Sequence, residues 1–268
     1  MKKIFLIILS INIFLGCEEV IELDLNSANP AIVIEANLTN SLEKNFVSIT
    51  ESTDFYNPGN YKTISGAEII ITVNNSTNYI LTETSPGKYF NTNLFAVPEN
   101  KYLIEVNYND KKYLAISTSP KSLIIDSLNY LLESRPFNKD KKFLELHVFF
   151  QDDPNIENYA RFVVYKNSEK LDGIFLFDDR LTNGNYIDFF FFNFNDEDFQ
   201  VGDVISIELN SIDKETHSYF KTLRNARANS SGGPFGSTAP ANPETNWNNN
   251  ALGYFSAFTI SEKSIILE

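Results

Sequence analysis

Cysteine is almost absent from this chain, and histidine is scarce. Among 268 residues there are one cysteine, Cys17, and two histidines, His147 and His217. A single cysteine forms no internal disulfide, and apart from Cys17 no thiol is present to act as a nucleophile or a zinc ligand. The histidines fall in an expected strand and an expected helix, where we interpret each as a structural residue.

The sequence also lacks the short motifs of common enzyme classes. It contains no G-x-S-x-G turn, H-E-x-x-H pair, P-loop or glycine-rich dinucleotide fingerprint. Carboxylates cluster at 152–153, 178–179 and 195–198 without the spacing of an EF-hand, so we interpret them as solvated turns rather than calcium ligands. We therefore expect no catalytic residue, no metal and no cofactor. A hydrolase that draws facing carboxylates from distant turns stays an alternative.

Basic residues are outnumbered by acidic ones. The chain has 22 Lys and Arg against 35 Asp and Glu, which gives a formal net charge of −13. Nucleic acids are bound by clustered cations that neutralise phosphates, so we expect no nucleic-acid partner. Aromatic residues are abundant instead, with 23 Phe and 13 Tyr. Together with frequent Ser, Thr and Asn, this composition is typical of a β-rich extracytoplasmic protein with a substantial core.

The N-terminal residues 1–16 are typical of a signal peptide. Two lysines precede an apolar run over 4–15, which is shorter than the roughly 20 residues that span a bilayer. The segment Phe14-Leu15-Gly16-Cys17 resembles a bacterial lipobox. That resemblance implies that Cys17 becomes the mature N-terminus and carries acyl chains such as palmitate, which anchor the protein to the membrane. The alternative is an ordinary signal peptide followed by a chance cysteine.

Two glutamates, Glu18 and Glu19, follow this cysteine directly. The arrangement resembles the export signal of surface lipoproteins in the Bacteroidota. We therefore expect a lipid-anchored outer-membrane protein that faces the cell exterior, with residues 17–30 as an acidic tether. A plain solvated tether without an export role is the alternative.

Residues 31–118 show short runs of β-branched and apolar residues separated by polar turns. We expect strands at 31–39 and 45–52, a hairpin over 64–83 that turns at 74–76, and a hairpin over 101–117 that turns at Asn109-Asp110. This spacing predicts an immunoglobulin- or transthyretin-like β-sandwich domain over 31–118.

A second block, residues 119–268, carries longer strands and one helix. Strands are expected at 142–150, 159–166, 173–177, 186–194, 203–209 and 251–267. A helix is predicted over 213–228, because Asp213 can cap it and Glu215 lies in its first turn. The sequence as a whole thus predicts a mainly β protein, in which the sandwich is followed by a second antiparallel β-rich domain with one helix.

Residues 188–194, Asp-Phe-Phe-Phe-Phe-Asn-Phe, are apolar on both faces of a regular strand. Phe190 and Phe192 share one face, and Phe189 and Phe191 share the other. A central strand covered on both sides explains this most simply. An exposed aromatic docking strip is the alternative.

A loop over 229–250 is rich in Gly, Pro, Ser and Asn and is long for a simple connection. Its large apolar side chains are those of Phe235 and Trp247. We predict that the loop lies outside either core and that these two residues contact a partner. The alternative is that they fold back and pin the loop to the protein.

Several segments, taken in order, resemble a known family. They are EEVIELDL, IVIEANLT, ISGAEIIIT, GKYF, KYLIEVNYNDKKYLA and NPETNWNNNALGYFSAF. The chain is similar to Bacteroidota lipoproteins of the domain-of-unknown-function 4249 family, and residues 65–115 also resemble a carboxypeptidase-regulatory or transthyretin-like β-sandwich. The resemblance implies a non-enzymatic accessory or binding subunit of a TonB-dependent outer-membrane transporter, and it supplies no catalytic residues. A free-standing glycan-binding or adhesive module and a cryptic hydrolase are the alternatives.

Overall fold

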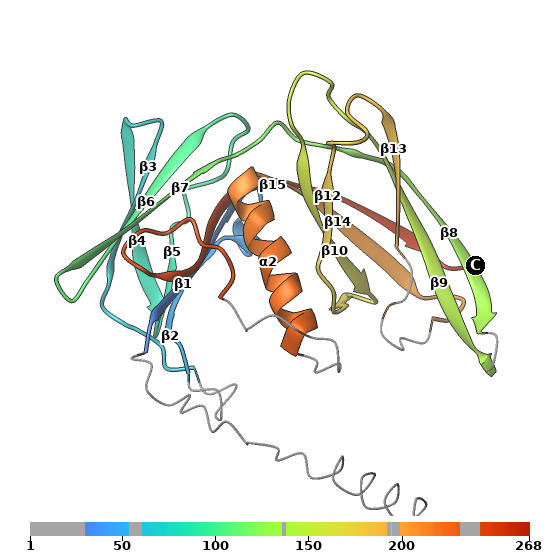
Figure 1. The fold of residues 1–268 in the computed structure, drawn as a ribbon, viewed down its shortest axis with the longest axis horizontal. Helices are drawn as coiled ribbons and strands as arrows, with labels where there is room; N and C mark the ends of the chain where they lie inside the picture. Colours follow the sequence, from blue (N-terminus) through green and yellow to red (C-terminus); the bar gives the residue numbers. More distant parts are fainter. Residues whose placement is uncertain (1–29, 54–60, 136–137, 192–193, 195–198, 231–241) are drawn as a thin grey trace, which may run out of the picture.

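The computed structural model describes residues 30–53, 61–135, 138–191, 194, 199–230 and 242–268. These residues form a mainly β fold with one α-helix, as the sequence predicts. A large mixed sheet and a separate three-stranded sheet make up the β-structure (Figure 1).

The large sheet contains 12 strands drawn from both halves of the chain. Those from the N-terminal half are β1 (Ile32–Thr39), β2 (Phe46–Glu51), β3 (Glu68–Val73), β4 (Thr77–Ser85), β5 (Lys88–Phe90), β6 (Lys101–Tyr108) and β7 (Lys111–Thr118). Those from the C-terminal half are β10 (Tyr159–Lys166), β11 (Glu169–Lys170), β12 (Phe175–Asp178), β14 (Val204–Ile212) and β15 (Leu252–Ile266). Their spatial order is β11-β10-β14-β15-β1-β2-β5-β4-β3-β6-β7, and β12 pairs with β10 outside this path.

The second sheet has the order β13-β9-β8. Its strands are β8 (Ile125–Arg135), β9 (Asn138–Gln151) and β13 (Tyr186–Phe191). The described part of the chain also contains a short 3-10 turn, η2 (Leu42–Lys44), and the helix α2 (Lys214–Ser230).

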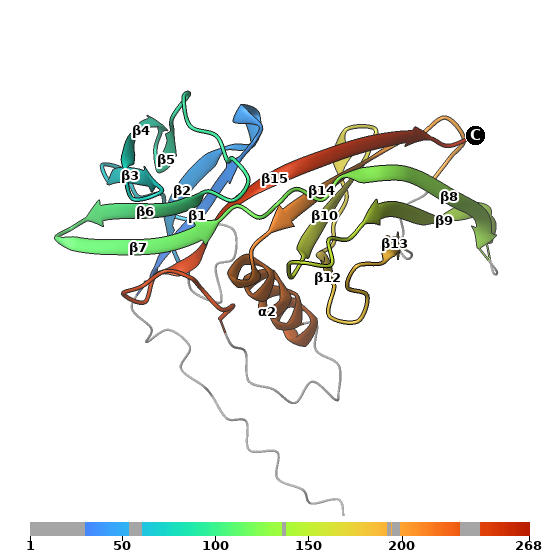
Figure 2. The ribbon, with the colours of Figure 1, turned by 90° about the horizontal axis from the view of Figure 1, so that it is seen from above.

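Strand β15 joins the two halves of the molecule. It pairs in parallel with β1 over Leu252–Phe258 and antiparallel with β14 over Thr259–Ile266. In Figure 2 this long strand runs from the N-terminal strands of the large sheet to its C-terminal strands. A clear sandwich followed by a separate second domain is therefore not what the structure shows. One hydrogen-bonded sheet continues through both, because the last strand returns to the first.

The two hairpin turns lie at the residues predicted for them. Asn74 and Asn75 have φ values of 48° and 56°, and Asn109 and Asp110 have values of 47° and 57°. Asn and Asp tolerate this left-handed region better than other residues with a side chain, and two such residues in succession form the turn that suits a β-hairpin. The predicted turns at 74–76 and 109–110 are confirmed.

The N-terminal strands enclose a first hydrophobic core. Its members are Ile34, Ala36, Leu38, Val47, Ile49, Ile64, Ala67, Ile69, Ile71, Leu81, Tyr89, Leu94, Ala96, Tyr102, Ile104, Val106, Tyr113, Ala115, Trp247, Ala251, Phe255 and Ala257. Strand β7 lies at the end of the sheet order, yet the Ala257 amide donates to Ser117 Oγ at 2.8 Å. The sheet therefore curls around this core until β7 comes back beside β15.

A second core fills the space between the C-terminal strands of the large sheet and the three-stranded sheet. It contains Ile205, Ile207 and Leu209 from one face of β14, and Leu144, Leu146, Val148 and Phe150 from one face of β9. Aromatic pairs bind the two layers, as in the stacked rings of Phe162 and Phe189, whose centroids are 4.4 Å apart. Each layer thus contributes alternate residues, as strands with one buried face must.

Helix α2 begins where the cap was predicted. Asp213 Oδ1 accepts a hydrogen bond from the Thr216 amide at 2.9 Å, which satisfies a free donor of the first turn. Asp213 Oδ2 accepts from Ser117 Oγ at 2.5 Å and from the Thr118 amide at 3.2 Å, so the cap also fixes the helix to β7. Figures 1 and 2 show the helix between the N-terminal strands and β10–β12.

Candidate functional site

Most of the site residues predicted from the sequence lie outside the described part of the chain. Cys17, Glu18, Glu19 and Phe235 are outside the described residues. Trp247 is described, and it lies in the first core with 5 % of its surface exposed. Its indole N–H donates to the Ile34 carbonyl at 3.0 Å. The prediction that this loop contributes to neither core is thus wrong for Trp247, whose side chain folds back and pins the chain.

Strand β13 differs from its predicted environment. It is an edge strand of the three-stranded sheet, and only one of its faces is covered. Phe189 and Phe191 pack in the second core, whereas Phe190 is 51 % exposed on the opposite face. The prediction of a central strand buried on both sides is wrong, because a thin sheet at the surface has a core on one side only. Phe192 lies outside the described residues.

Among the described residues, the outer face of β9 and β13 carries a row of four rings, which we call the aromatic ladder: Tyr186, Phe149, His147 and Phe190. Successive ring centroids are 6.2, 6.1 and 5.8 Å apart, and the planes are inclined by 15°, 13° and 28°. Tyr186 and Phe190, at its two ends, are 57 % and 51 % exposed. The inner faces of both strands pack in the second core, which supports the ladder from behind.

Two carboxylates hold the imidazole of His147 in the ladder. Nδ1 lies 2.8 Å from Asp188 Oδ1, and Nε2 lies 3.1 Å from Glu145 Oε1. Desolvation acts to lower the pKa of His147, but the hydrogen bonds to Asp188 and Glu145 outweigh it, and the pKa is raised. The ladder therefore combines apolar rings with one imidazole and two carboxylates on a single exposed surface.

The other histidine lies in a different environment. His217 is buried in α2, and its ring centroid is 5.1 Å from that of Tyr159. Desolvation lowers the pKa of His217. Its position agrees with the interpretation of a structural residue.

A second polar arrangement lies on the face of the large sheet that α2 covers. We call it the polar layer and define it by Arg161 and Tyr165 of β10, Lys170 of β11, Glu208 and Asn210 of β14, and Lys44 of η2. Cross-strand register places these strand residues on one face, because Asn210 lies opposite Arg161 and Lys170 lies opposite Tyr165. The opposite face of β14 forms the second core.

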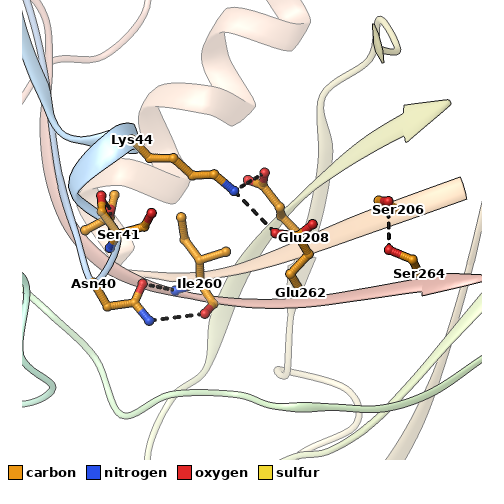
Figure 3. Close-up of polar contacts among 9 residues, drawn as sticks. Asn40, Ser41, Lys44, Ser206, Glu208, Ile260, Glu262 and Ser264 are labelled. Atoms are coloured by element: carbon orange, nitrogen blue, oxygen red, sulfur yellow. Dashed lines mark hydrogen bonds and ion pairs between the residues drawn. The ribbon is translucent and has the colours of Figure 1, made fainter. Parts of the chain in front are cut away.

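Lys44 connects the N-terminal turn η2 to this layer (Figure 3). Its Nζ lies 2.5 Å from Glu208 Oε1 and 3.5 Å from Glu262 Oε2. Beside it, the Asn40 amide group exchanges two hydrogen bonds with the backbone of Ile260, at 2.9 and 3.2 Å. These contacts extend the junction of β1 with β15 beyond the last backbone pair.

Several buried polar atoms near α2 have no hydrogen-bond partner in the described part of the chain. They are Asn37 Oδ1, Arg161 Nε, Asn210 Oδ1, Thr216 Oγ1 and Ser256 Oγ. Buried polar groups normally have hydrogen-bond partners. Unpaired ones lower stability, so a group of them indicates residues that are present for a reason other than stability.

Comparison with protein families gives a match over most of the chain. The sequence matches the family described as a domain of unknown function, DUF4249, over residues 18–264. The chain belongs to the DUF4249 family. None of the curated proteins matches it.

The last family-like segment of this DUF4249 chain, NPETNWNNNALGYFSAF, ends in the first residues of β15, and its asparagines contact both β7 and β15. The Asn246 side chain donates to the carbonyls of Ile116 and Phe255, and its Oδ1 accepts from the Phe255 amide. Asn248 pairs with both backbone groups of Leu114. The asparagines of the segment thus have structural roles, in addition to the core role of Trp247.

The acidic turns of this DUF4249 chain are only partly as predicted. Asp152 and Asp179 are 1 % and 3 % exposed, so the interpretation of solvated turns is wrong for them. Asp152 Oδ2 accepts from the Gly184 amide at 2.7 Å, and Asp179 Oδ2 accepts from the Asn158 amide at 2.7 Å. These carboxylates fix loops to one another. No group of three or more His, Cys, Asp or Glu side chains with metal-site geometry occurs among the described residues, and residues 195–198 lie outside them.

The polar layer of this DUF4249 chain was not predicted from the sequence. Its visible trace is the alternation in Val-Ile-Ser-Ile-Glu-Leu-Asn-Ser-Ile over 204–212, which places Glu208 and Asn210 on one face. Such a pattern ordinarily indicates a solvated face, and both residues are in fact buried. Within the described residues, no helix is both long enough and apolar enough to cross a membrane.

Proposed function

We propose that this chain is a non-enzymatic outer-membrane lipoprotein of the Bacteroidota, anchored by acyl chains on Cys17 and directed to the cell surface by Glu18 and Glu19. It acts as an accessory or binding subunit of a TonB-dependent transporter. The lipobox-like segment and the two glutamates support the anchor and the location. The exposed aromatic ladder is the observation that carries the docking role.

The ladder has the properties of a contact surface. Aromatic side chains are enriched in the energetically dominant parts of interfaces, because they cover a large area at a small cost in conformational entropy. Here the rings of Tyr186 and Phe190 are held in place by strands whose other faces are packed. A partner therefore meets a preformed surface and orders little of it on binding.

The organisation of the chain into two units belongs to the same proposal. The first core, built largely from residues before 118, supports a transthyretin-like N-terminal unit over 31–118. The second core, built from residues after 122, supports a C-terminal unit over 119–268 that carries the ladder. The N-terminal unit then acts as a spacer between the anchor and the ladder.

Replacement of the ladder's end residues tests the docking role. We expect Tyr186→Ala with Phe190→Ala to leave the melting temperature within a few degrees of wild type, because both side chains are largely exposed. Recovery of the transporter from detergent-solubilised outer membrane should fall at least about tenfold, as expected when two central aromatic contacts are lost. The matched control is Ile80→Ala, which removes a side chain that is 70 % exposed on β4, away from the ladder. Unchanged recovery with the double variant would refute the docking role.

A glycan-binding function is the second candidate, and the same surface favours it. Rings beside carboxylates, as in Phe190 beside His147 and Asp188, offer apolar contact together with hydrogen-bond acceptors. Protein lacking residues 1–17 and free of any transporter should then bind glycans, and Tyr186→Ala should remove that binding. Retained glycan affinity without transporter recovery would favour the free-standing module.

A further inference from the structure

The end of the polar layer beside β11 brings three cations together. Arg161 lies against α2, with its guanidinium carbon 4.1 Å from the centroid of the Phe220 ring. Lys170 lies opposite Tyr165 of β10. Tyr165 comes four residues after Arg161 on that strand, so Lys170 and Arg161 are on the same face of the sheet. Arg227 lies in the last turn of α2. Its Nη1 is 3.7 Å from Asp172 Oδ1.

The two arginines act electrostatically on Lys170. Desolvation lowers the pKa of Lys170, and the charges of Arg161 and Arg227 act in the same direction. The carboxylates of Glu208 and Asp172 oppose them, but the pKa stays lowered. Burial likewise lowers the pKa of Arg161. Three cations at one place stand out in a chain with a net charge of −13.

The guanidinium of Arg161 has no anionic partner among the described residues. Its Nε is buried without an acceptor, and no carboxylate there lies within ion-pair distance of it. Glu208, whose charge acts on Arg161 to raise its pKa against the effect of burial, is paired with Lys44, whose Nζ lies 2.5 Å from its Oε1. The adjacent Asn210 has an equally unpaired Oδ1. A buried guanidinium N–H that lacks an acceptor is costly, and Nε of Arg161 is such a group.

We infer that Arg161, Lys170 and Arg227 form a binding site for a small anion that carries a carboxylate or phosphate group. Arg161 lies at the base of this site, where its planar donors suit two oxygens of one anionic group. Lys170 is exposed and the side chain of Arg227 is 61 % exposed, so both are accessible from solvent at the rim. A hydroxyl on the ligand would supply the donor that Asn210 Oδ1 lacks, which favours hydroxy acids over simple acids.

The site is tested with purified protein that lacks residues 1–17, in thermal melts and calorimetric titrations. The probes are acetate, glycolate and inorganic phosphate at constant ionic strength, with chloride as the reference. We expect saturable stabilisation by at least one probe above chloride. Phosphate alone would identify a phosphate site, and glycolate above acetate would identify a hydroxy-acid site. No stabilisation above chloride by any of the three would overturn the inference.

Variants locate the binding. Arg161→Lys keeps the positive charge but loses the planar guanidinium that can donate two parallel hydrogen bonds to one anion. It should weaken binding about tenfold or more. Lys170→Gln changes an exposed rim residue without risk to folding, and should weaken it about threefold. The control is Arg180→Gln, because Arg180 is an exposed arginine whose Nε pairs with Asp178 at 2.7 Å, so its loss should leave binding unchanged. Equal binding by all variants would show that the anion binds elsewhere, and would leave the docking role of the ladder untouched.

Discussion

Truncation of the only tryptophan should destabilise the whole protein. Trp247 is 5 % exposed, packs with Phe255 at a ring-centroid distance of 6.5 Å, and donates to the Ile34 carbonyl. Removal of a buried aromatic side chain costs about 3–5 kcal/mol, because contacts are lost and a cavity remains. At roughly 2–4 °C per kcal/mol in a protein of this size, Trp247→Ala should lower the melting temperature by roughly 6–20 °C.

Two further variants separate the parts of this cost. Trp247→Phe keeps most of the apolar contact but removes the indole donor, and should cost about 1–2 kcal/mol. Val97→Ala, at a side chain that is 50 % exposed, should change stability by less than about 0.5 kcal/mol. Circular dichroism follows all of them, and in wild type the fluorescence of Trp247 alone should shift to longer wavelength in the same transition. A Trp247→Ala melt that coincides with wild type would refute the core assignment.

Three other perturbations follow from the contacts described. Lys44→Met should cost about 2–3 kcal/mol in urea denaturation, because it leaves buried Glu208 without its cation; adding Glu208→Gln should restore most of the loss, and no restoration would contradict this reasoning. The raised pKa of His147 means that its protonated form contributes stability that is complete below pH 6.5, the ordinary value, and is lost as the pH rises through the higher folded pKa; His147→Gln should flatten that part of a pH–stability curve, and an unaltered curve would assign the dependence to other groups. Gly253→Ala should reduce folding yield sharply, because a Cβ there would lie 2.2 Å from the Ile34 carbonyl oxygen; normal yield and stability would show that β1 and β15 can separate.

Local pattern was enough to predict most strands, but not how they assemble. Hairpins at 64–83 and 101–117 are set by turn residues and by alternation, which are properties of neighbouring positions. The pairing of β1 with β15 joins residues more than 200 positions apart, such as Val33 and Leu252. Either strand alone reads as an ordinary apolar strand, so nothing local indicates that one sheet crosses the predicted domain boundary.

The candidate sites likewise depend on tertiary structure that local sequence does not indicate. The Phe run at 188–194 indicates a strand, but hydrophobicity does not distinguish a Phe in a core from a Phe on a surface, because much of any protein surface is apolar. Phe190 and Phe191 are adjacent in sequence and differ in exposure only because one sheet face has a core. The anion site draws on β10, β11 and α2, so its cations are separated in sequence by unrelated residues.

The asparagine-rich segment shows how an apparently mobile loop can have a structural role. Strand β7 ends the large sheet, and an uncovered edge strand exposes a row of backbone groups that can pair with another chain. Here Asn249 Nδ2 donates to the Lys112 carbonyl, Asn248 pairs with both backbone groups of Leu114, and Asn246 Nδ2 donates to the Ile116 carbonyl. Asparagine offers a donor and an acceptor on one short side chain, so it can replace the missing strand without extended backbone. The segment therefore covers the sheet edge, and Trp247 anchors it in the first core.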